Sequence, residues 1–516
     1  MTPQGSRFGP WIGGLLLLAG WELADRLLSD AFVLAGPVAV ARFLMDEGAL
    51  MGRALAVTLG NAAVGFVIGN LAALALAGVA VVWPRSERVV TGLALLVFCL
   101  PLVATGPILR VLFGPGPGPQ ITLAALAVYY TTLIPLLVGL RAVPDTWVEL
   151  VRSTGRGRLA VLVHVRAMAA LPALCAGLQI AAPAAFLGAM VGEFTGAERG
   201  MGVLTIRAMR ALDVPMTWSL ATVATAVAVL AYLALGALAR RVLRAPPPVI
   251  LAAPSVRSKQ GAAWRDVALV AALALGGWAA VIGLGGLNPF FAKGPGDVVT
   301  ALVFAPDAPE TRATLGAALA ETAVFLLPGY AAGLAAGAGL AVLLVLLPGV
   351  AGTVLPLAIA LRSVPIVTTA PLVVLLLGRG ALGTIVLVAV MVFFPTLVAC
   401  LHGLRQTPGQ VLDVFDSFAA GPVTRLIRLR IPAMWPAFFA AARMAVPASV
   451  LAVTVVEWLA TGSGMGRLMA LSASLSDYDM LWSCVVVVSV LAALGYALVG
   501  AVERRVLAVY APEQQT

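Results

Sequence analysis

Gly139-Leu-Arg-Ala-Val-Pro144 and Gly403-Leu-Arg-Gln-Thr-Pro408 share three leading residues and a final proline, and they lie 264 positions apart. Three more groups of residues recur at this offset. The paired groups are Thr58, Gly65 and Gly69 with Thr322, Gly329 and Gly333, then Pro101, Pro107 and Gly114 with Pro365, Pro371 and Gly378, then Glu193 and Gly200-Met-Gly202 with Glu457 and Gly464-Met-Gly466. One offset held across four features indicates two copies of a single unit.

The composition places both copies in a membrane. Of the 516 residues, 61% are hydrophobic and only 11% are charged, whereas soluble domains carry roughly 25% charged residues. Four cysteines are too few for a secreted disulfide scaffold. The net charge of +10 does not indicate a nucleic-acid partner, because the chain holds too little polar sequence to build a DNA-binding protein. The remaining class is an integral membrane protein with many spans.

Apolar runs long enough to cross the hydrocarbon core, about 20 residues each, predict about twelve helical spans. The runs, most of them uncharged, are 8–23, 54–83, 89–109, 111–140, 167–192, 214–239, 267–292, 322–361 (one helix, a turn and the start of another), 363–378, 381–404, 433–456 (interrupted by Arg443) and 480–502. We interpret the first run as a retained span and not a signal peptide, because a similar segment occurs deep inside the chain.

These spans predict an all-α polytopic membrane protein built from two parallel six-helix repeats. An even number of spans returns each unit to its starting side, so the two units are related by an axis along the membrane normal. The expected divisions are a first unit over 1–239, a linker over 240–265 and a second unit over 266–516. Basic residues gather in the loops of one side, above all in 141–166, 240–265 and 405–430, which places that side and both termini in the cytoplasm.

One cytoplasmic loop in each unit, between the fourth and fifth spans, has the pattern of a short helix followed by a break. In the first unit Pro144-Asp145-Thr146 starts the helix and Gly155 ends it. In the second unit Thr407 and Pro408 start the helix, and Gly421-Pro422 breaks it. Amphipathic helices lying on the bilayer are the alternative, but matching loops in both halves favour a docking surface for a cytoplasmic partner.

With these loops the sequence resembles the membrane-spanning permeases of binding-protein-dependent ABC importers, and most of all the nitrate/sulfonate/taurine (aliphatic sulfonate) branch. The family signature is an acidic residue, a glycine six positions on, and an apolar-Pro pair about twelve further. The first copy reads Glu149-Leu-Val-Arg-Ser-Thr-Gly155 with Leu171-Pro172 slightly late, and the second reads Asp413-Val-Phe-Asp-Ser-Phe-Ala419 with Ile431-Pro432. This chain departs from the usual single unit that dimerises, because two diverged units are fused.

The resemblance implies that each loop forms a coupling helix seated in an ATPase subunit. The implied coupling residues are Glu149, Arg152 and Gly155 in the first loop and Asp413, Asp416, Ala419 and Gly421 in the second. The substitutions Asp413 and Ala419 lead us to expect unequal engagement of two cytoplasmic ATPase subunits. Also implied are ATP and Mg²⁺ on those subunits, a separate extracytoplasmic solute-binding protein, contact with membrane lipid, and a place in the bacterial inner membrane.

The chain itself is not expected to be an enzyme or to hold a cofactor. A phosphate-binding loop of the form Gly-x-x-x-x-Gly-Lys-Ser/Thr needs a lysine, and Lys259 and Lys293, the only lysines, do not fit it. The two histidines and four cysteines show no catalytic or metal-binding spacing. An ion-gradient-driven transporter with twelve helices is the main alternative. It predicts a basic loop after the second span, but Pro348-Gly349-Val-Ala-Gly352 is uncharged.

Polar residues inside spans are the candidates for the substrate pathway, because a charge there is costly. Arg362 replaces Phe98 of the first copy, and Arg443 replaces Gln179. With Thr368 and Thr369 as weaker candidates, they would suit an anion such as a sulfonate or nitrate. Alternatively, Arg443 snorkels to the interface and Arg362 pairs with a carbonyl or Glu321. Glu193 and Glu457, at the outer ends of the fifth spans, are expected to shape an outer gate or to contact the binding protein.

Overall fold

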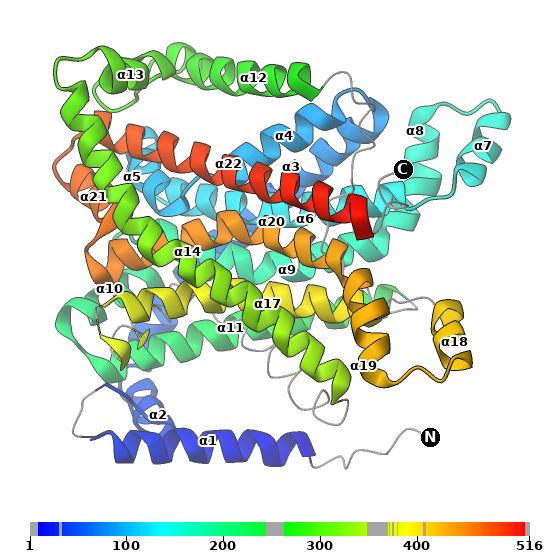
Figure 1. Ribbon diagram of the computed structural model, residues 1–516. Coiled ribbons are helices and arrows are strands. Elements are labelled where there is room, and N and C mark those ends of the chain that lie inside the picture. The colour runs from blue at the N-terminus through cyan, green and yellow to red at the C-terminus, as the bar shows by residue number, and fades with distance from the viewer. Residues whose placement is uncertain are drawn as a thin grey trace.

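In the computed structural model the described residues form helices joined by turns and loops (Figure 1). The residues that the structure describes are 9–29, 33–114, 116–243, 263–347, 370, 372–373, 376–378, 380–405 and 409–510. The first half holds α1 (Gly9–Leu27), α2 (Pro37–Asp46), α3 (Gly48–Val82), α4 (Glu87–Phe98), α5 (Leu102–Phe113), α6 (Gly118–Arg141), α7 (Asp145–Ser153), α8 (Arg158–Val161), η2 (Leu162–Arg166), α9 (Ala167–Glu193), α10 (Met201–Ala211) and α11 (Val214–Val242).

The second half repeats this order at the predicted offset. It holds α12 (Ala263–Leu284), α13 (Pro295–Val299), η3 (Thr300–Phe304), α14 (Ala308–Leu346), α17 (Ala381–Arg405), α18 (Gly409–Ser417), α19 (Pro422–Arg425), η4 (Leu426–Arg430), α20 (Ile431–Val456), η5 (Glu457–Thr461), α21 (Gly464–Ser474) and α22 (Tyr478–Tyr510). The helices α3, α6, α9 and α11 therefore correspond to α14, α17, α20 and α22.

Within the described residues, nine helices are long and apolar enough to cross a membrane, or ten if the bent pair α4 and α5 counts as one span. The predicted count of twelve is not confirmed. Helix α1 is not among the nine, because Glu22, Asp25 and Arg26 crowd its last turns. Most of the third span of the second copy, over 363–378, lies outside the described residues, and so does nearly all of the linker over 240–265.

The third span of the first copy, predicted as one run over 89–109, is instead two helices that meet at 92°. Helix α4 ends at Phe98, and α5 begins after Pro101, whose extended backbone (ψ 99°) stands at the N-cap. A proline cannot donate the backbone hydrogen bond that would continue α4, and it disfavours helical geometry in the residue before it. The uncharged run therefore concealed a sharp bend.

The repeated glycines lie where two spans touch in each unit. Helix α6 packs against α3 and α9, as α17 packs against α14 and α20. A Cβ on Gly69 would lie 2.6 Å from the carbonyl oxygen of Ala125, and one on Gly333 would lie 2.5 Å from that of Ala389. Only glycine permits such close approach of helix backbones, which explains why this part of the pattern recurs.

The two halves share their buried core. Ala104 and Ile108 of α5 belong to the same cluster as Met465 of α21 and Leu481 of α22. At the periphery, α12 packs along α4 of the other half, where Arg88 Nη1 forms an ion pair with Asp266 Oδ2 at 2.6 Å. The units are therefore packed as one body of helices. In Figure 1 the short helices α7, α8, α18 and α19 project from one end of the bundle, which we call the loop end; α10, α13 and α21 lie at the opposite end.

Candidate functional site: the paired loops and the buried carboxylates

Each unit presents a helix–break–helix segment at the loop end, as predicted. In the first unit, α7 follows Pro144 and Gly155 stands just beyond its end with φ +75°. In the second unit, α18 begins at Gly409, and Gly421 caps α19; the predicted starting residues Thr407 and Pro408 lie outside the described residues. The second helix of each pair runs on through a π-helical turn, η2 or η4, into the fifth span.

Apolar side chains on these segments face away from the bundle at equivalent positions. On α7, Trp147 and Leu150 are 57% and 68% exposed, and Val411 and Val414 occupy the same places on α18. The other face of α7 is anchored, because Val148 packs in a small cluster of its own loop segment. Burial of exposed apolar side chains is the main driving force of protein association, so both helices have the character of docking elements.

The two loops differ in charge and in backbone strain. Where the first has Arg152, the second has Asp416, whose carboxylate pairs with Arg425 at 2.5 Å. Where the first has Gly155, the second has Ala419 at φ +48°, a left-handed conformation that costs a residue with a side chain about 1–2 kcal/mol. Phe418, beside it, is 81% exposed. The predicted loop residues Glu149 and Asp413 are both exposed.

At the opposite end, each unit buries a carboxylate that holds a short helix in place. Glu193, which is 1% exposed, accepts a hydrogen bond from Thr58 Oγ1 and another from the backbone N–H of Gly202, both at 2.7 Å. Thr58 Oγ1 accepts in turn from the N–H of Met201 at 2.9 Å. These groups satisfy two of the free N–H groups that open α10, and they tie α10 to α3 and α9.

The second unit repeats this arrangement with one addition. Glu457 Oε2 accepts from Thr322 Oγ1 at 3.1 Å and from the N–H of Gly466 at 2.9 Å. Glu321, where the first unit has Val57, also accepts from the N–H of Gly464 at 2.8 Å. The other oxygen of Glu457, Oε1, is buried and has no hydrogen-bond partner among the described residues. Both carboxylates are buried, so neither is presented for direct contact with another protein.

Sequence reasoning identified Thr58 and Thr322 only as repeat markers. Their role as partners of the buried carboxylates was missed, although the two residues recur at the same offset as Glu193 and Glu457. Threonine and glutamate at positions 135 residues apart in both copies were the available signal.

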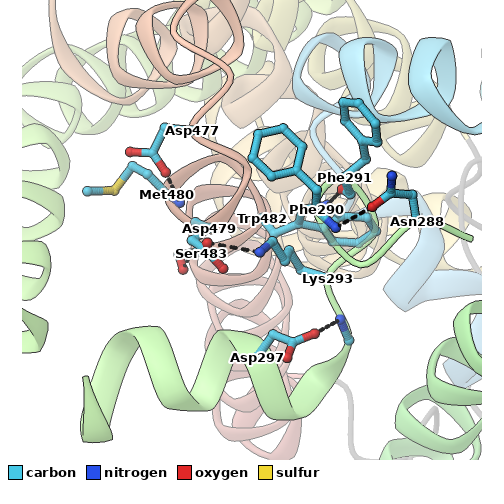
Figure 2. A network of polar contacts seen from close by, with 11 residues as sticks. Asn288, Phe290, Phe291, Lys293, Asp297, Asp477, Asp479, Met480, Trp482 and Ser483 are labelled. Carbon is cyan, nitrogen blue, oxygen red and sulfur yellow. Dashed lines mark hydrogen bonds and ion pairs between the residues drawn. The ribbon is translucent and has the colours of Figure 1, made fainter.

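The second unit also carries a polar network beside this end (Figure 2). Lys293 Nζ forms an ion pair with Asp479 Oδ2 at 3.0 Å, and thereby joins the loop after α12 to the start of α22. Trp482 of α22 donates its indole N–H to the carbonyl oxygen of Phe291 at 3.0 Å and stacks on Trp278 of α12. The network fastens a peripheral helix to the sixth span.

The predicted pathway residues are not brought together within the described structure. Arg362, Thr368 and Thr369 lie outside the described residues. Arg443 Nε forms an ion pair with Glu503 Oε2 at 3.0 Å, and its guanidinium lies 5.7 Å from the ring centre of Tyr496. The guanidinium of Arg443 is therefore paired with a carboxylate of the sixth span.

Gln179, the counterpart of Arg443, makes the equivalent contact in the first unit. Its Nε2 donates to the carbonyl oxygen of Tyr232 at 3.2 Å, and Tyr232 corresponds to Tyr496. Both positions thus join the fifth span to the sixth span of the same unit. That Arg443 and Gln179 line the substrate pathway stays a prediction.

The chain matches one protein family twice, over residues 65–246 and 322–508, and that family is described as the binding-protein-dependent transport system inner membrane component. A riboflavin transport system permease protein from Chloroflexus aurantiacus is 32% identical over 235 residues, which are 45% of this chain and 87% of that protein. A probable ABC transporter permease protein from Haemophilus influenzae is 31% identical over 169 residues, 33% of this chain and 67% of that protein. A putative aliphatic sulfonates transport permease protein from Escherichia coli is 27% identical over 237 residues, 45% and 87% of the two chains.

Proposed function

Because the chain belongs to the family of binding-protein-dependent transport system inner membrane components, we propose that its two fused permease units move a small solute into the cell by alternating access. The permease domain occurs twice in one integral inner membrane protein, and such subunits have no ATPase activity or cofactor of their own. Family membership also counts against the main alternative, an ion-gradient-driven transporter. The proposed units span 1–239 and 266–516, joined by a linker over 240–265.

The observation that carries the coupling assignment is the pair of exposed apolar helices, α7 and α18, at equivalent positions on one end of the bundle. We propose that each seats in one of two separate ATPase subunits, and that the loop end and both chain termini are cytoplasmic. The residues proposed to make these contacts are Glu149, Arg152 and Gly155 in the first loop and Asp413, Asp416, Ala419 and Gly421 in the second. Their differing charges and backbone geometry support unequal engagement of the two subunits.

The opposite end is proposed to form the outer gate and to receive the solute-binding protein. Glu193 and Glu457 would act there by positioning α10 and α21, because both carboxylates are buried and bonded to the first turns of those helices. Their proposed role is therefore to shape the gate, and direct binding-protein contact is assigned to exposed residues around them.

The class of solute is proposed from Arg362, a candidate positive charge of the pathway. The relatives named above transport, by their descriptions, riboflavin in one case and aliphatic sulfonates in another. Since Arg443 is paired with Glu503, a positive charge for an anion would come from Arg362, with Thr368 and Thr369 nearby in sequence. We propose a small anion such as a sulfonate or nitrate, and Arg362→Ala should then reduce uptake of taurine and nitrate more than uptake of a neutral pyrimidine. Equal loss for all three solutes would refute the anion assignment.

Co-purification tests the coupling assignment. The tagged chain, expressed with the ATPase genes that neighbour it, should retain the ATPase, and the pair Glu149→Arg with Asp413→Arg should release it. Glu198→Arg is a matched control, because Glu198 is an exposed acid at the opposite end. Retention of the ATPase by the double variant, together with unchanged uptake, would show that the importer is not coupled through these loops.

A further inference from the structure

An apolar groove of about 450 Å³ lies between α14 and α20, the second and fifth spans of the second unit. Its α14 wall contains Ala331, Ala335 and Ala338, and its α20 wall contains Met434, Trp435 and Phe438. Tyr330 also lines the groove, but its hydroxyl donates to the carbonyl oxygen of Ala442 at 2.8 Å. The surface offered to an occupant is therefore hydrocarbon.

Small residues facing large aromatic ones create this groove, and the first unit lacks the combination. At the positions of the three alanines the first unit has Val67, Leu71 and Leu74. Leu71 is 60% exposed and Val67 is 55% exposed, so this side of the second span faces outward. For a helix that crosses the membrane, outward means toward the acyl chains. The groove is thus a recess in the lipid-facing surface of the second unit.

A row of side chains that starts with an arginine leads along α20 from the loop end to the groove. Arg430 precedes Met434 by four residues and Phe438 by eight, so the three lie along one ridge of a helix that runs unbroken from η4 into α20. Arg430 therefore lies one turn, about 6 Å, nearer the loop end than Met434. Its Nε is buried and has no hydrogen-bond partner among the described residues.

A second arginine, Arg428, lies two residues before Arg430 in η4 and adds positive charge to this segment. It is exposed, and no ion pair joins it to another described residue. Arg425, by contrast, is already held by Asp416 and by the carbonyl oxygen of Ala420. In the first unit the counterpart of Arg428 is His164, whose ring contacts the carbonyl oxygen of Ala160 at 3.0 Å. The three alanines and the two arginines occur together only in the sequence of the second unit.

We propose that this groove binds an anionic phospholipid, with one acyl chain between α14 and α20 and the phosphate held by Arg428 and Arg430. Guanidinium groups pair with phosphate through two parallel hydrogen bonds, and basic pockets at the cytoplasmic ends of spans hold lipid headgroups. Because η4 directly continues α19, the second helix of the loop segment, the bound headgroup would brace that segment. That last consequence rests on the proposed function, whereas lipid binding itself does not.

Fluorescence quenching by brominated acyl chains tests the site, because bromine quenches only a tryptophan that it touches. The full chain is placed in nanodiscs of phosphatidylethanolamine containing a small fraction of brominated phosphatidylglycerol or brominated phosphatidylethanolamine. The chain has ten tryptophans, so the signal of Trp435 is taken as the difference between the wild type and Trp435→Phe. We expect phosphatidylglycerol to quench this signal at least several-fold more efficiently than phosphatidylethanolamine.

Two variants separate the acyl and headgroup contributions. Ala331→Val/Ala335→Leu/Ala338→Leu, which installs the first unit's residues, should abolish quenching of Trp435 by both lipids. Arg428→Gln/Arg430→Gln should leave quenching by phosphatidylethanolamine unchanged and remove the preference for phosphatidylglycerol. Arg156→Gln/Arg505→Gln, a loss of two exposed charges at the same end, is the matched control and should keep the preference.

Equal quenching by the two lipids in the wild type would overturn the headgroup assignment, and unchanged quenching in the triple variant would overturn the groove. A helical circular dichroism spectrum and a single size-exclusion peak establish that each variant is folded. The quenching experiment measures lipid contact and not transport. A negative result would therefore refute the lipid site, whereas a negative ATPase co-purification would refute the proposed function.

Discussion

Two substitutions of Glu193, the buried carboxylate of the first unit, should separate the contribution of its hydrogen bonds to stability from the contribution of its charge. Glu193→Ala leaves the N–H of Gly202 without its acceptor in a fully buried site, whereas the Thr58 hydroxyl can still donate to the carbonyl oxygen of Ala54. A buried donor left unsatisfied costs about 1–3 kcal/mol. One such donor predicts a loss of about 1–3 kcal/mol in the free energy of unfolding, before any contribution from the cavity.

Glu193→Gln should cost less than about 1 kcal/mol, because every group can still be satisfied. The amide oxygen can accept from Gly202, and the amide nitrogen can donate to Thr58 Oγ1. The Thr58 hydroxyl can then donate to the carbonyl oxygen of Ala54, which lies 3.2 Å away. The same exchange at Glu457 should cost more, because its Oε1 has no partner in the described structure to receive an amide nitrogen.

The assay is unfolding by sodium dodecyl sulfate in mixed micelles, followed by the loss of helical circular dichroism. Thr58→Ser and Thr58→Val supply controls, since serine keeps the hydroxyl and valine keeps only the shape. Thr58→Val should be the more destabilising of the two. If Glu193→Gln lowers stability as much as Glu193→Ala, the negative charge is what the site requires and the hydrogen-bond reasoning is wrong.

Three further predictions concern positions on the loops and between the spans. Ala419→Gly should raise the free energy of unfolding by up to about 1 kcal/mol by relieving the positive φ, and Gly155→Ala should lower it by about the same amount. Changes of the same sign in both variants, measured by urea or detergent titration, would contradict this reasoning. Arg443→Gln should cost about 1–3 kcal/mol because it removes the ion-pair partner of the largely buried Glu503 carboxylate, with Arg504 as the remaining cationic neighbour. Arg443→Gln/Glu503→Ala, which reproduces the first unit, should restore most of that stability in the same titration. Gly69→Ala should cost about 1–3 kcal/mol, since its Cβ would overlap the backbone of α6, and a melting temperature equal to that of the wild type would show that the two helices can separate at no cost.

Residues adjacent in sequence carried most of what could be predicted. The short helix before Gly155 and the break at Gly421-Pro422 were predicted because turn chemistry is local, and both are confirmed. The bend at Pro101 had its signal in the sequence, but an uncharged run does not reveal whether a proline ends a helix or merely kinks it. The predicted count of twelve spans is not confirmed, because α1 carries three charges in its last turns and most of the span over 363–378 lies outside the described residues.

Contacts between distant residues could not be predicted. The partner of Arg443 is Glu503, one span later in the chain, and no spacing rule connects two residues on different helices. The groove between α14 and α20 depends on the size of alanines on one helix and aromatic rings on another. The sequence contained both sets, but only packing shows that they face each other.

Fusion of the two units explains which features recur and which do not. In a permease made of two identical chains, any substitution changes both halves, so a change that harms one half cannot be accepted for a benefit in the other. In a fused chain each half is substituted alone. The Thr–Glu–N–H cluster recurs because each of its groups is buried and losing any one strands the others without hydrogen bonds. Among the positions that differ, Arg443 carries a partner, Glu503, that changed with it, whereas Ala335 and Phe418 are exposed. At such positions one unit can change without breaking a buried network, and there the two halves of one transporter can acquire different partners.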